Sequence, residues 1–502
     1  MSESHALAAV RPEIRTTTAG TVRGVCEDGA CRFLGVPYAA PPVGPNRFRE
    51  PQPVEPWSGQ RDARQPGATA RYKIPTFPGL DIVPLIGTGE DGGDDFLHAD
   101  IWAPAEGQGR PVMVWIHGGA FVLGSKDASV HNGKAFAQSG VVFVALNYRL
   151  NIDGFLPIPG VPTNLGLRDM IAGLRWVQDN AAAFGGDPQN VTLFGESAGA
   201  MAIADLVTSP LAKGLFRRAI IQSGHGGMVR DIPTARRLVR KLAKLLRITP
   251  DEQGFRSVEF ERGWAAIEKA GKPFNRIDLR DASGHEPVFG ISRFTPVWGD
   301  DILPQAPHEA LKDGAGADVD ILIGTNAEEM NFYFVPTKVK DKLPGWLAKW
   351  LLKKSHPTPR ATLKAYGYGR KGVRPGQAFT AAMTDLVFRW PARRFAEEHR
   401  GRTHVYEFEW RSPRYGGEFG ATHGMELGFV FKTLPAVTGP DGLAGENPPA
   451  DLAERIHKIW VDFATDGRLP WPAFTRDRRN VHLLAADTTI DEPVMPVAPY
   501  LP

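Results

Sequence analysis

The sequence predicts an α/β protein with a mostly parallel central sheet and helices on both faces of that sheet. Two observations carry this prediction. Several short apolar runs rich in β-branched residues are bounded by glycines and charges, which is typical of strands in a covered sheet. Stretches with helical periodicity separate many of these runs, and this alternation favours parallel pairing.

Six runs are expected to form strands, in the following chain order. They are Pro111–Ile116, Val141–Leu146, Val191–Phe194, Ala219–Gln222, Asp320–Ile323 and His404–Phe408. The clearest helix covers Leu165–Phe184, where Leu167, Ile171 and Leu174 form part of an apolar stripe at helical spacing. We expect one catalytic domain over residues 1–502, with helical insertions at approximately 225–318 and 331–400.

Composition excludes several classes of protein. A hydrophobic content of 42% is enough for a large core, so the chain is not a disordered one. Lysine and arginine nearly balance aspartate and glutamate, and a net charge of +3 without a nucleic-acid-binding motif argues against a nucleic-acid partner. The first residues lack a signal-peptide pattern, and no run of about 18 apolar residues could anchor the chain in a membrane. We therefore expect a cytoplasmic protein, whose oligomeric state the sequence does not indicate.

Ser197 lies in the pattern Gly-x-Ser-x-Gly, between Gly195 and Gly199. A predicted strand precedes this pattern and a helix-compatible run follows it, as in the sharp turn that exposes a nucleophilic serine. The same turn would aim the N–H group of Ala198 at a developing oxyanion. The alternative, a glycine-rich turn without chemistry, is weakened by a second motif, "HGGAF". There Gly118 and Gly119 follow a predicted strand and can offer further backbone donors.

A serine nucleophile needs a base and an acid that orients the base. In this kind of fold the chain order is serine, acid, histidine. The segment "GTNAEEM" follows a predicted strand and offers Glu328 and Glu329, while "GATHGMELGFVF" offers His423 after the last predicted strand.

These motifs, with "FLGVPYAAPPVGPNRFREPQPVEPWSG" at residues 33–59 and the block "NLGLRDMIAGLRWVQDNAAAFGGDPQNVTLFGESAGA" at residues 164–200, resemble the type-B carboxylesterases. This family includes the cholinesterases, and the chain is most similar to its bacterial p-nitrobenzyl esterase type. The resemblance implies an α/β-hydrolase fold, with helical insertions over the active site, and a serine esterase that needs no cofactor and no metal.

The resemblance also implies a role for each site residue. Ser197 would be the nucleophile, His423 the base and Glu329 the acid, with Glu328 as the fallback. Gly118, Gly119 and Ala198 would form the oxyanion hole. Glu196 and Ser223 match supporting residues of the family, although an ordinary buried hydrogen-bonding role suits both equally well. Two departures stand out: Met330 replaces the glycine after the acid, and Asn151 occupies a position that is usually glycine.

The expected substrate is a small-molecule ester. Gly290 and Ser292 align with acyl-pocket positions where acetylcholinesterase has bulky aromatic residues, so we expect a roomy acyl pocket and broad specificity. The choline-binding region has no match in residues 69–89. Hydrolysis of carbamates, amides or natural-product esters is an alternative that the triad does not discriminate. A non-catalytic cholinesterase-like binding protein is a weaker one, because every triad position is filled.

Three further features have two interpretations each. Asp28-Gly29 predicts a hairpin turn that sets Cys26 opposite Cys31, and free thiols are favoured over a disulfide in a reducing cytoplasm. The basic stretch Ala235–Arg247 and the stretch "GWLAKWLLKK", with Trp346 and Trp350 one turn apart, are interpreted as helices packed on the core with solvated basic faces. On this interpretation we expect no peripheral membrane contact, although such a contact is an alternative for both stretches. In a further alternative, the two tryptophans cover the active-site mouth and admit hydrophobic esters.

Overall fold

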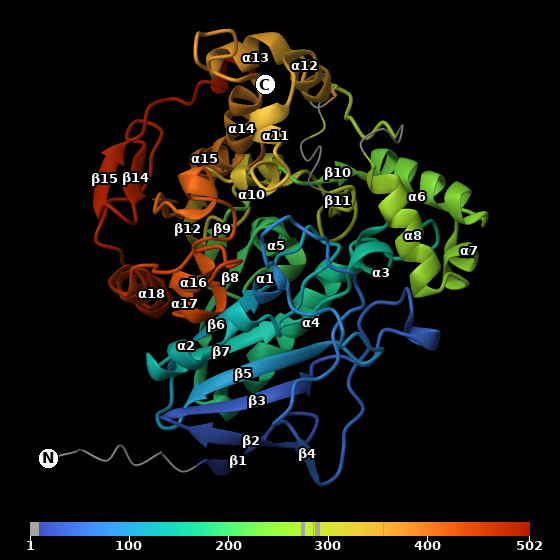
Figure 1. The fold of residues 1–502 in the computed structure, drawn as a ribbon. Helices are drawn as coiled ribbons and strands as arrows, with labels where there is room; N and C mark the ends of the chain where they lie inside the picture. The colour runs from blue at the N-terminus through green and yellow to red at the C-terminus, as the bar shows by residue number, and fades with distance from the viewer. Residues whose placement is uncertain (1–9, 273–276, 285, 287–291, 355, 502) are drawn as a thin grey trace, which may run out of the picture.

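A computed structural model describes residues 10–272, 277–284, 286, 292–354 and 356–501 of the chain. Its main sheet has 13 strands, in the order β1-β2-β3-β5-β7-β6-β8-β9-β12-β13-β14-β15, with β4 paired to β2. Figure 1 shows this sheet running through the whole molecule. The pairs from β7 to β14 are parallel, as expected for a mostly parallel sheet. Toward the two ends of the sheet the pairs are antiparallel, except for the parallel pair of β2 with β4.

The strands have the following bounds. They are β1 (Arg11–Thr16), β2 (Thr21–Glu27), β3 (Ala30–Pro37), β4 (Gln60–Asp62), β5 (His98–Pro104), β6 (Arg110–Ile116), β7 (Val142–Leu146), β8 (Gly186–Glu196), β9 (Arg218–Gln222), β12 (Asp320–Asn326), β13 (Thr403–Phe408), β14 (Asn480–Leu483) and β15 (Thr488–Asp491), with β10 (Arg230–Asp231) and β11 (Val297–Trp298) as a separate pair. All six predicted strands are therefore confirmed, as parts of β6, β7, β8, β9, β12 and β13.

The helices vary widely in length. They are α1 (Val83–Ile86), α2 (Lys134–Gln138), α3 (Asn151–Phe155), α4 (Leu165–Asn180), α5 (Ala198–Thr208), α6 (Ile232–Leu246), α7 (Glu252–Arg256), α8 (Phe260–Gly271), α9 (Pro307–Lys312), α10 (Asn331–Phe334), α11 (Val339–Lys342), α12 (Gly345–Lys353), α13 (Pro359–Ala365), α14 (Pro375–Thr384), α15 (Trp390–Glu398), α16 (Leu427–Val430), α17 (Leu434–Val437) and α18 (Ala450–Asp466). The π-helix η5 (Asp385–Arg389) joins α14 to α15. The predicted helix Leu165–Phe184 is α4 followed by one 3₁₀ turn.

The sheet separates two hydrophobic cores. On β6, Val112, Val114 and Ile116 belong to the core that contains residues of α4 and α5. The alternate residues Met113 and Trp115 belong to the second core, with residues of α16 and α18. Because both faces of β6 are buried, its sequence is an uninterrupted apolar run instead of an alternating one.

The hairpin between β2 and β3 corrects the prediction of free thiols. Asp28 and Gly29 form its turn with φ values of 50° and 78°, and Cys26 lies directly opposite Cys31. The two cysteines form a disulfide, with their Cα atoms 3.9 Å apart. The turn prediction was therefore right, whereas the argument from a reducing compartment led to the wrong pairing state.

The two predicted basic helices differ in how they pack. In α6, Leu238, Val239 and Leu242 are buried while Arg237 and Arg240 are exposed, as predicted for a packed amphipathic helix. In α12, by contrast, Trp346 and Trp350 are exposed. No helix in the described part of the chain has the length and apolar character needed to cross a membrane.

Candidate active site

Ser197 occupies a sharp turn between β8 and α5, as the motif predicts. Its φ of 54° and ψ of −123° lie outside the regular regions of the backbone map. A Cβ atom on Gly199 would lie 2.1 Å from the carbonyl oxygen of Ile116, and one on Gly195 would lie 2.5 Å from the same oxygen. Both glycines are therefore required, because α5 and β8 pass directly against the end of β6.

Ser197, His423 and Glu329 lie in a continuous line of hydrogen bonds. The Nε2 atom of His423 is 2.8 Å from the Ser197 hydroxyl oxygen, and its Nδ1 atom is 2.6 Å from Oε2 of Glu329. All three residues are buried. Glu329 follows β12 and His423 lies in the loop between β13 and α16, so the ends of neighbouring strands bring the three together.

The neighbouring Glu328 points away from this line. Its carboxylate pairs with Arg411 and accepts a 3.0 Å bond from the backbone N–H of Ala421. Met330 has a φ of −74°, an ordinary value that allows a side chain, and its side chain is buried in the core. The replacement of a glycine by Met330 therefore leaves the geometry of Glu329 intact.

Ser223 and the backbone hold the carboxylate of Glu329. The Ser223 hydroxyl donates a 2.6 Å bond to Oε1, and the N–H of Asn326 donates a 2.8 Å bond to the same atom. With His423 on Oε2, both carboxylate oxygens are hydrogen-bonded and their position is fixed. The structure thus places the predicted supporting residue Ser223 in direct contact with Glu329.

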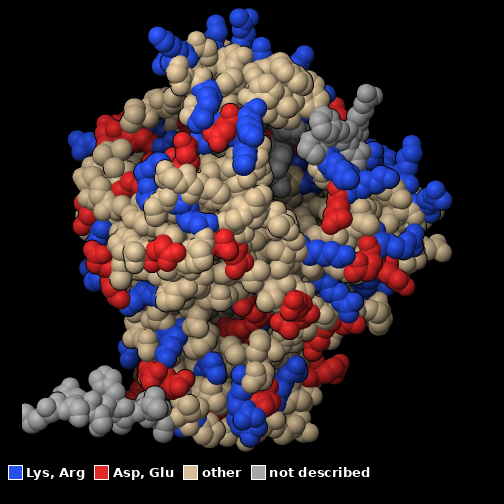
Figure 2. Space-filling model, in the orientation of Figure 1, with Lys and Arg blue, Asp and Glu red and all other residues tan. Residues whose placement is uncertain are grey.

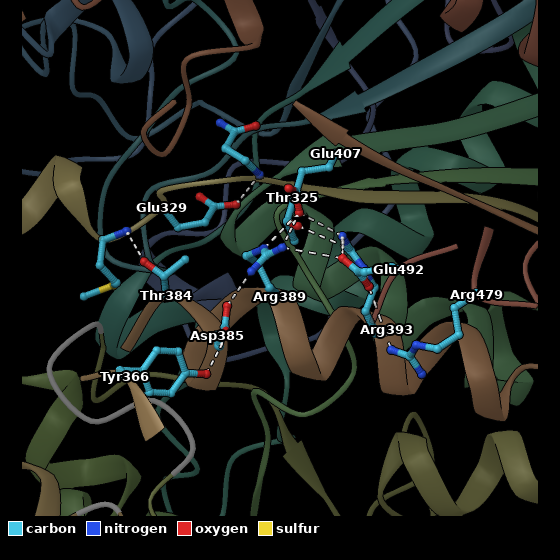
Figure 3. Close-up of polar contacts among 12 residues, drawn as sticks. Thr325, Glu329, Tyr366, Thr384, Asp385, Arg389, Arg393, Glu407, Arg479 and Glu492 are labelled. Atoms are coloured by element: carbon cyan, nitrogen blue, oxygen red, sulfur yellow. Dashed lines mark hydrogen bonds and ion pairs between the residues drawn. The ribbon is translucent and has the colours of Figure 1, made fainter. Parts of the chain in front are cut away.

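A buried ionic network lies behind Glu329 (Figure 3). Arg393 donates to Thr325 on β12 at 3.1 Å and pairs with Glu492 at 3.0 Å. Arg389 of η5 pairs with Asp385 at 2.8 Å and with Glu407 of β13 at 2.6 Å. The network therefore joins β12, the strand that precedes Glu329, to η5. That π-helix in turn places the ring of Phe388 4.7 Å from the ring of His423.

Glu196 is the second carboxylate beside His423, since its Oε1 atom is 3.1 Å from Nε2. Burial raises the pKa of Glu196 to about 8. Burial also lowers the pKa of His423, but the charges of Glu196 and Glu329 more than offset this and raise it to about 9. The negative charge of Glu196 is what favours a proton on His423, and this charge is lost when Glu196 itself is protonated. The two side chains therefore compete for one proton.

The sequence argument missed a third buried glutamate, Glu426. Its carboxylate accepts bonds from the side-chain amides of Gln222 at 3.1 Å and Asn326 at 2.7 Å, and burial raises its pKa. Asn326 also donates to the carbonyl oxygen of Thr422, next to His423. Glu426 therefore ties the histidine loop to β9 and β12. Its position three residues after His423 was the available signal.

The loop after β6 offers a row of backbone donors beside Ser197. In the described part of the chain, the N–H groups of Gly118, Gly119, Ala120 and Ala198 have no hydrogen-bond acceptor. Gly118, Gly119 and Ala120 line the same cavity as Ser197. Ala120 was not predicted as a donor, although it directly follows the glycine pair in "HGGAF".

The carbonyl oxygens of this loop are all held by hydrogen bonds. His117 Nδ1 donates to the Gly118 oxygen at 2.8 Å, and two N–H groups donate to the Gly119 oxygen. The Ser292 hydroxyl can donate its proton to the Ala120 oxygen at 2.8 Å or to the Phe294 oxygen at 2.9 Å. The next carbonyl along, that of Phe121, accepts a 2.7 Å bond from the N–H of Asn151. With every carbonyl held, the N–H groups stay available to a substrate.

Asn151 explains one departure from the family pattern. Its φ of 46° is in the left-handed region, where glycine is common and asparagine is tolerated better than most residues. Its side-chain oxygen accepts a 2.7 Å bond from the N–H of Ile152, which stabilises this conformation locally. The asparagine therefore preserves the turn that supports the Phe121 carbonyl.

A cavity of about 200 Å³ opens onto Ser197 and His423. Its remaining walls are mainly apolar and come from four segments far apart in sequence. They include Pro75, Phe77, Ile82, Leu85, Ile86, Leu123, Phe332, Tyr333 and Leu427. Residues 75–86 therefore contribute to the site, although the sequence argument could not assign them.

Neither of the two predicted acyl-pocket residues is among the described residues that line this cavity. Gly290 falls outside the described residues. Ser292 turns its hydroxyl to the loop after β6 and is not a wall of the described cavity. Trp346 and Trp350 are likewise not among the described residues that line it.

Known proteins resemble this chain along nearly its full length. The profile of the carboxylesterase family matches residues 11–492. A para-nitrobenzyl esterase of Bacillus subtilis (strain 168) is 34% identical over 499 residues, which cover 95% of this chain and 96% of the relative. A phenmedipham hydrolase of Pseudarthrobacter oxydans is 34% identical over 489 residues, covering 92% and 93%. A fumonisin B1 esterase of Sphingopyxis macrogoltabida is 32% identical over 502 residues, covering 92% and 85%.

Solved structures give the same picture. A PNB esterase superposes with a TM-score of 0.83 at 31% identity, covering 98% of this chain and 99% of the other. A Geobacillus stearothermophilus carboxylesterase superposes with a TM-score of 0.82 at 31% identity, covering 97% and 100%. The predicted α/β-hydrolase fold is therefore confirmed.

Proposed function

Because the chain belongs to the carboxylesterase family and is a serine carboxylic-ester hydrolase, we propose that Ser197, His423 and Glu329 are its catalytic triad. The observation that carries this proposal is the line of contacts from the serine hydroxyl, through both nitrogens of His423, to Glu329. Gly118, Gly119 and Ala198 serve as oxyanion donors, and Ala120 joins them because its N–H also has no acceptor among the described residues.

In the first half of the reaction, Ser197 Oγ attacks the ester carbonyl while His423 Nε2 takes the hydroxyl proton. The carbonyl oxygen becomes an oxyanion and accepts bonds from the backbone donors. His423 then gives its proton to the departing alcohol, which leaves an acyl-enzyme on Ser197. Throughout, Glu329 accepts the bond from Nδ1 and so keeps Nε2 directed at the reacting atoms.

In the second half, His423 removes a proton from water as the water oxygen attacks the acyl carbon. A second oxyanion forms in the same donor pocket. When it collapses, the bond to Ser197 breaks and Oγ regains its proton from His423. The carboxylic acid leaves, and the triad returns to its starting state without consuming a cofactor.

The substrate class follows from the cavity walls. Phe77, Leu85 and Leu427 offer an apolar surface next to Ser197, which suits an aryl or alkyl group better than a charged one. The relatives are named for quite different substrates, which is in keeping with broad ester specificity. Carbamates, amides and natural-product esters remain the alternative, since the same triad would attack their carbonyl groups.

Hydrolysis of short p-nitrophenyl esters tests the triad. We expect Ser197→Ala to abolish turnover and Glu329→Gln to reduce kcat about a thousandfold or more, because a neutral amide no longer orients and stabilises the imidazolium. Glu328→Gln is the matched control. The Glu328 carboxylate contacts Arg411 and the N–H of Ala421 instead of His423, so its loss should affect kcat little. Comparable losses for both glutamine variants, or activity that survives Ser197→Ala, would contradict the assignment.

A series of aryl esters with growing acyl chains tests the predicted roomy acyl pocket. We expect kcat/KM to hold or rise from acetate to longer acyl esters. Activity confined to acetates would rule out this part of the proposal.

A further inference from the structure

Helix α12 exposes two large aromatic side chains. Trp346 is 69% exposed and Trp350 is 38% exposed, whereas the other ten tryptophans of the chain are buried or partly buried. Leaving a tryptophan in water forgoes the largest hydrophobic gain that any side chain offers. Two on one short helix therefore indicate a surface that meets an apolar or interfacial partner.

The packing of α12 holds these side chains outward. Ala348 and Leu352 are buried on its inner face, and the helix packs against α13 and α14. Trp346 and Trp350 are four residues apart, so they share one outward edge of the helix. The ammonium of Lys354 lies 3.7 Å from the centre of the Trp350 ring, which adds a cation to the same edge.

The surrounding segment is strongly basic. Residues 338–374 contain eleven lysines and arginines and one acidic residue, Asp341, a net charge of +10. The whole chain has a net charge of +3, so the remainder carries −7. Eight of these cations are exposed: Lys338, Lys342, Lys353, Arg360, Lys364, Arg370, Lys371 and Arg374. Figure 2 shows blue side chains at the top of the molecule, where Figure 1 places α12 and α13.

We propose that the surface formed by residues 338–354 and 356–374, which we call the basic cap, docks on an anionic lipid bilayer. Exposed tryptophans favour the headgroup region of a bilayer, and clustered lysines and arginines are attracted to anionic lipids. The contact is peripheral, with the tryptophans at headgroup depth and the cations around them.

The combination of exposed cations and exposed tryptophans favours a lipid bilayer over nucleic acid as the partner. The phosphates of a nucleic-acid duplex would use the cations, but a duplex has no unstacked bases for the two outward tryptophans to bind. Helix α6 provides the internal comparison. It is also basic, but its leucines and valine are buried and it presents no exposed aromatic side chain, so it offers charge alone.

Vesicle co-sedimentation with the full chain tests the proposal. The probes are vesicles of phosphatidylcholine mixed with phosphatidylglycerol, and vesicles of phosphatidylcholine alone. We expect binding to the mixed vesicles to be at least about tenfold tighter, and to weaken as salt is added. The double variant Trp346→Ala/Trp350→Ala should lose about tenfold in binding to mixed vesicles.

Two controls separate docking from loss of fold or of chemistry. Val494→Ala changes a residue that is 65% exposed outside the basic cap, and it should bind vesicles as the wild type does. All three proteins should hydrolyse a short water-soluble ester at the same rate, because none of these residues lines the cavity at Ser197. Equal binding to both vesicle types would overturn the proposal. So would tryptophan-independent binding, the result expected of a generic polyanion site.

Discussion

At the scale of single residues, Ser197 has a backbone conformation that its neighbours must maintain. A positive φ in a non-glycine residue of this kind costs about 1–3 kcal/mol. Its N–H donates to the Gln222 carbonyl at 2.9 Å, and its own carbonyl accepts from the N–H of Met201. The strand β9 and the first turn of α5 thus fix the serine before any substrate arrives, and this is preorganisation rather than induced positioning.

Ser292 gives the first residue-scale prediction. Removing its hydroxyl with Ser292→Ala leaves the Ala120 carbonyl without its 2.8 Å donor, so the loop after β6 can rotate and misalign its N–H groups. We expect kcat to fall about tenfold with KM little changed, because the oxyanion forms only after binding. Ser257→Ala is the matched control, since that hydroxyl donates to the Gly254 carbonyl in α7. Equal kcat values in the two variants would show that the loop needs no support from Ser292.

Glu196 gives the second prediction, on pH dependence. Its carboxylate, 3.1 Å from Nε2, raises the pKa of His423, and a raised pKa means that the base becomes neutral only at higher pH. Glu196→Gln should therefore move the acid limb of the kcat/KM profile to lower pH. Glu426→Gln serves for comparison and should move the limb less, because the charge of Glu426 raises the pKa of His423 less than that of Glu196 does. An acid limb that stays in place or moves upward in the Glu196 variant would count against this electrostatic role.

Local sequence patterns predicted the site residues that lie in motifs, such as Ser197. They did not predict the cavity residues whose position depends on contacts between distant segments. Ser197 is recognisable because strand, tight turn and helix must be adjacent in sequence. Phe77 and Tyr333 line the same cavity, yet no local pattern distinguishes them from ordinary core residues. Their position depends on how distant segments fold back, which a single sequence does not specify.

At the scale of elements, the strands that have a local sequence pattern were predicted, and β1, which has none, was not. The six predicted strands lie in the interior, where burial on both faces produces uninterrupted apolar runs. Strand β1 was not predicted, because it lies at the sheet edge and is largely exposed, so its sequence carries no such run. The separation of Glu328 from Glu329 was also beyond pattern reasoning. It depends on Arg411, which lies beyond the next strand.

The ionic network between β12 and η5 gives an element-scale prediction. Arg393 is 1% exposed, and Arg393→Met would leave the buried Glu492 and the partly buried Glu407 with fewer partners. We expect the free energy of unfolding to fall by about 3 kcal/mol in urea titrations. Arg402→Met is the matched control. That arginine pairs with Asp320 at the start of the same strand but is largely solvated, so the loss should stay below about 1 kcal/mol.

The pH dependence of this loss has a definite sign. Burial raises the pKa of Glu492, but Arg393 and Arg389 offset that effect and hold the pKa below its usual value. A depressed carboxyl pKa stabilises the fold above the unfolded-state pKa, and this stabilisation is lost as the pH falls through the folded-state pKa. The difference between wild type and Arg393→Met should therefore narrow on acidification. A constant difference would assign the loss to packing instead of charge.

At the scale of the whole molecule, the strand order places the disulfide hairpin near one edge of the sheet and Ser197 near its centre. The disulfide Cys26–Cys31 lies in the β2–β3 hairpin, and β5, β7 and β6 stand between that hairpin and β8, which carries Ser197. Closing so short a loop restricts the unfolded chain only modestly, by about 2 kcal/mol. We expect Cys26→Ser/Cys31→Ser, or the reduced wild type, to lose that much stability in urea titrations.

The same separation predicts that reduction leaves kcat unchanged. No residue of the hairpin lines the cavity at Ser197, and the parallel block from β7 to β14 is held by its own helices. Hydrolysis of a short ester with and without dithiothreitol measures this directly, and the double serine variant shows whether any effect of the reductant acts through these two thiols. If kcat falls in step with the stability, the edge hairpin and the active site are one cooperative unit, contrary to the order of the strands. If kcat holds, the enzyme works equally well with its thiols reduced, as the predicted cytoplasmic location would require.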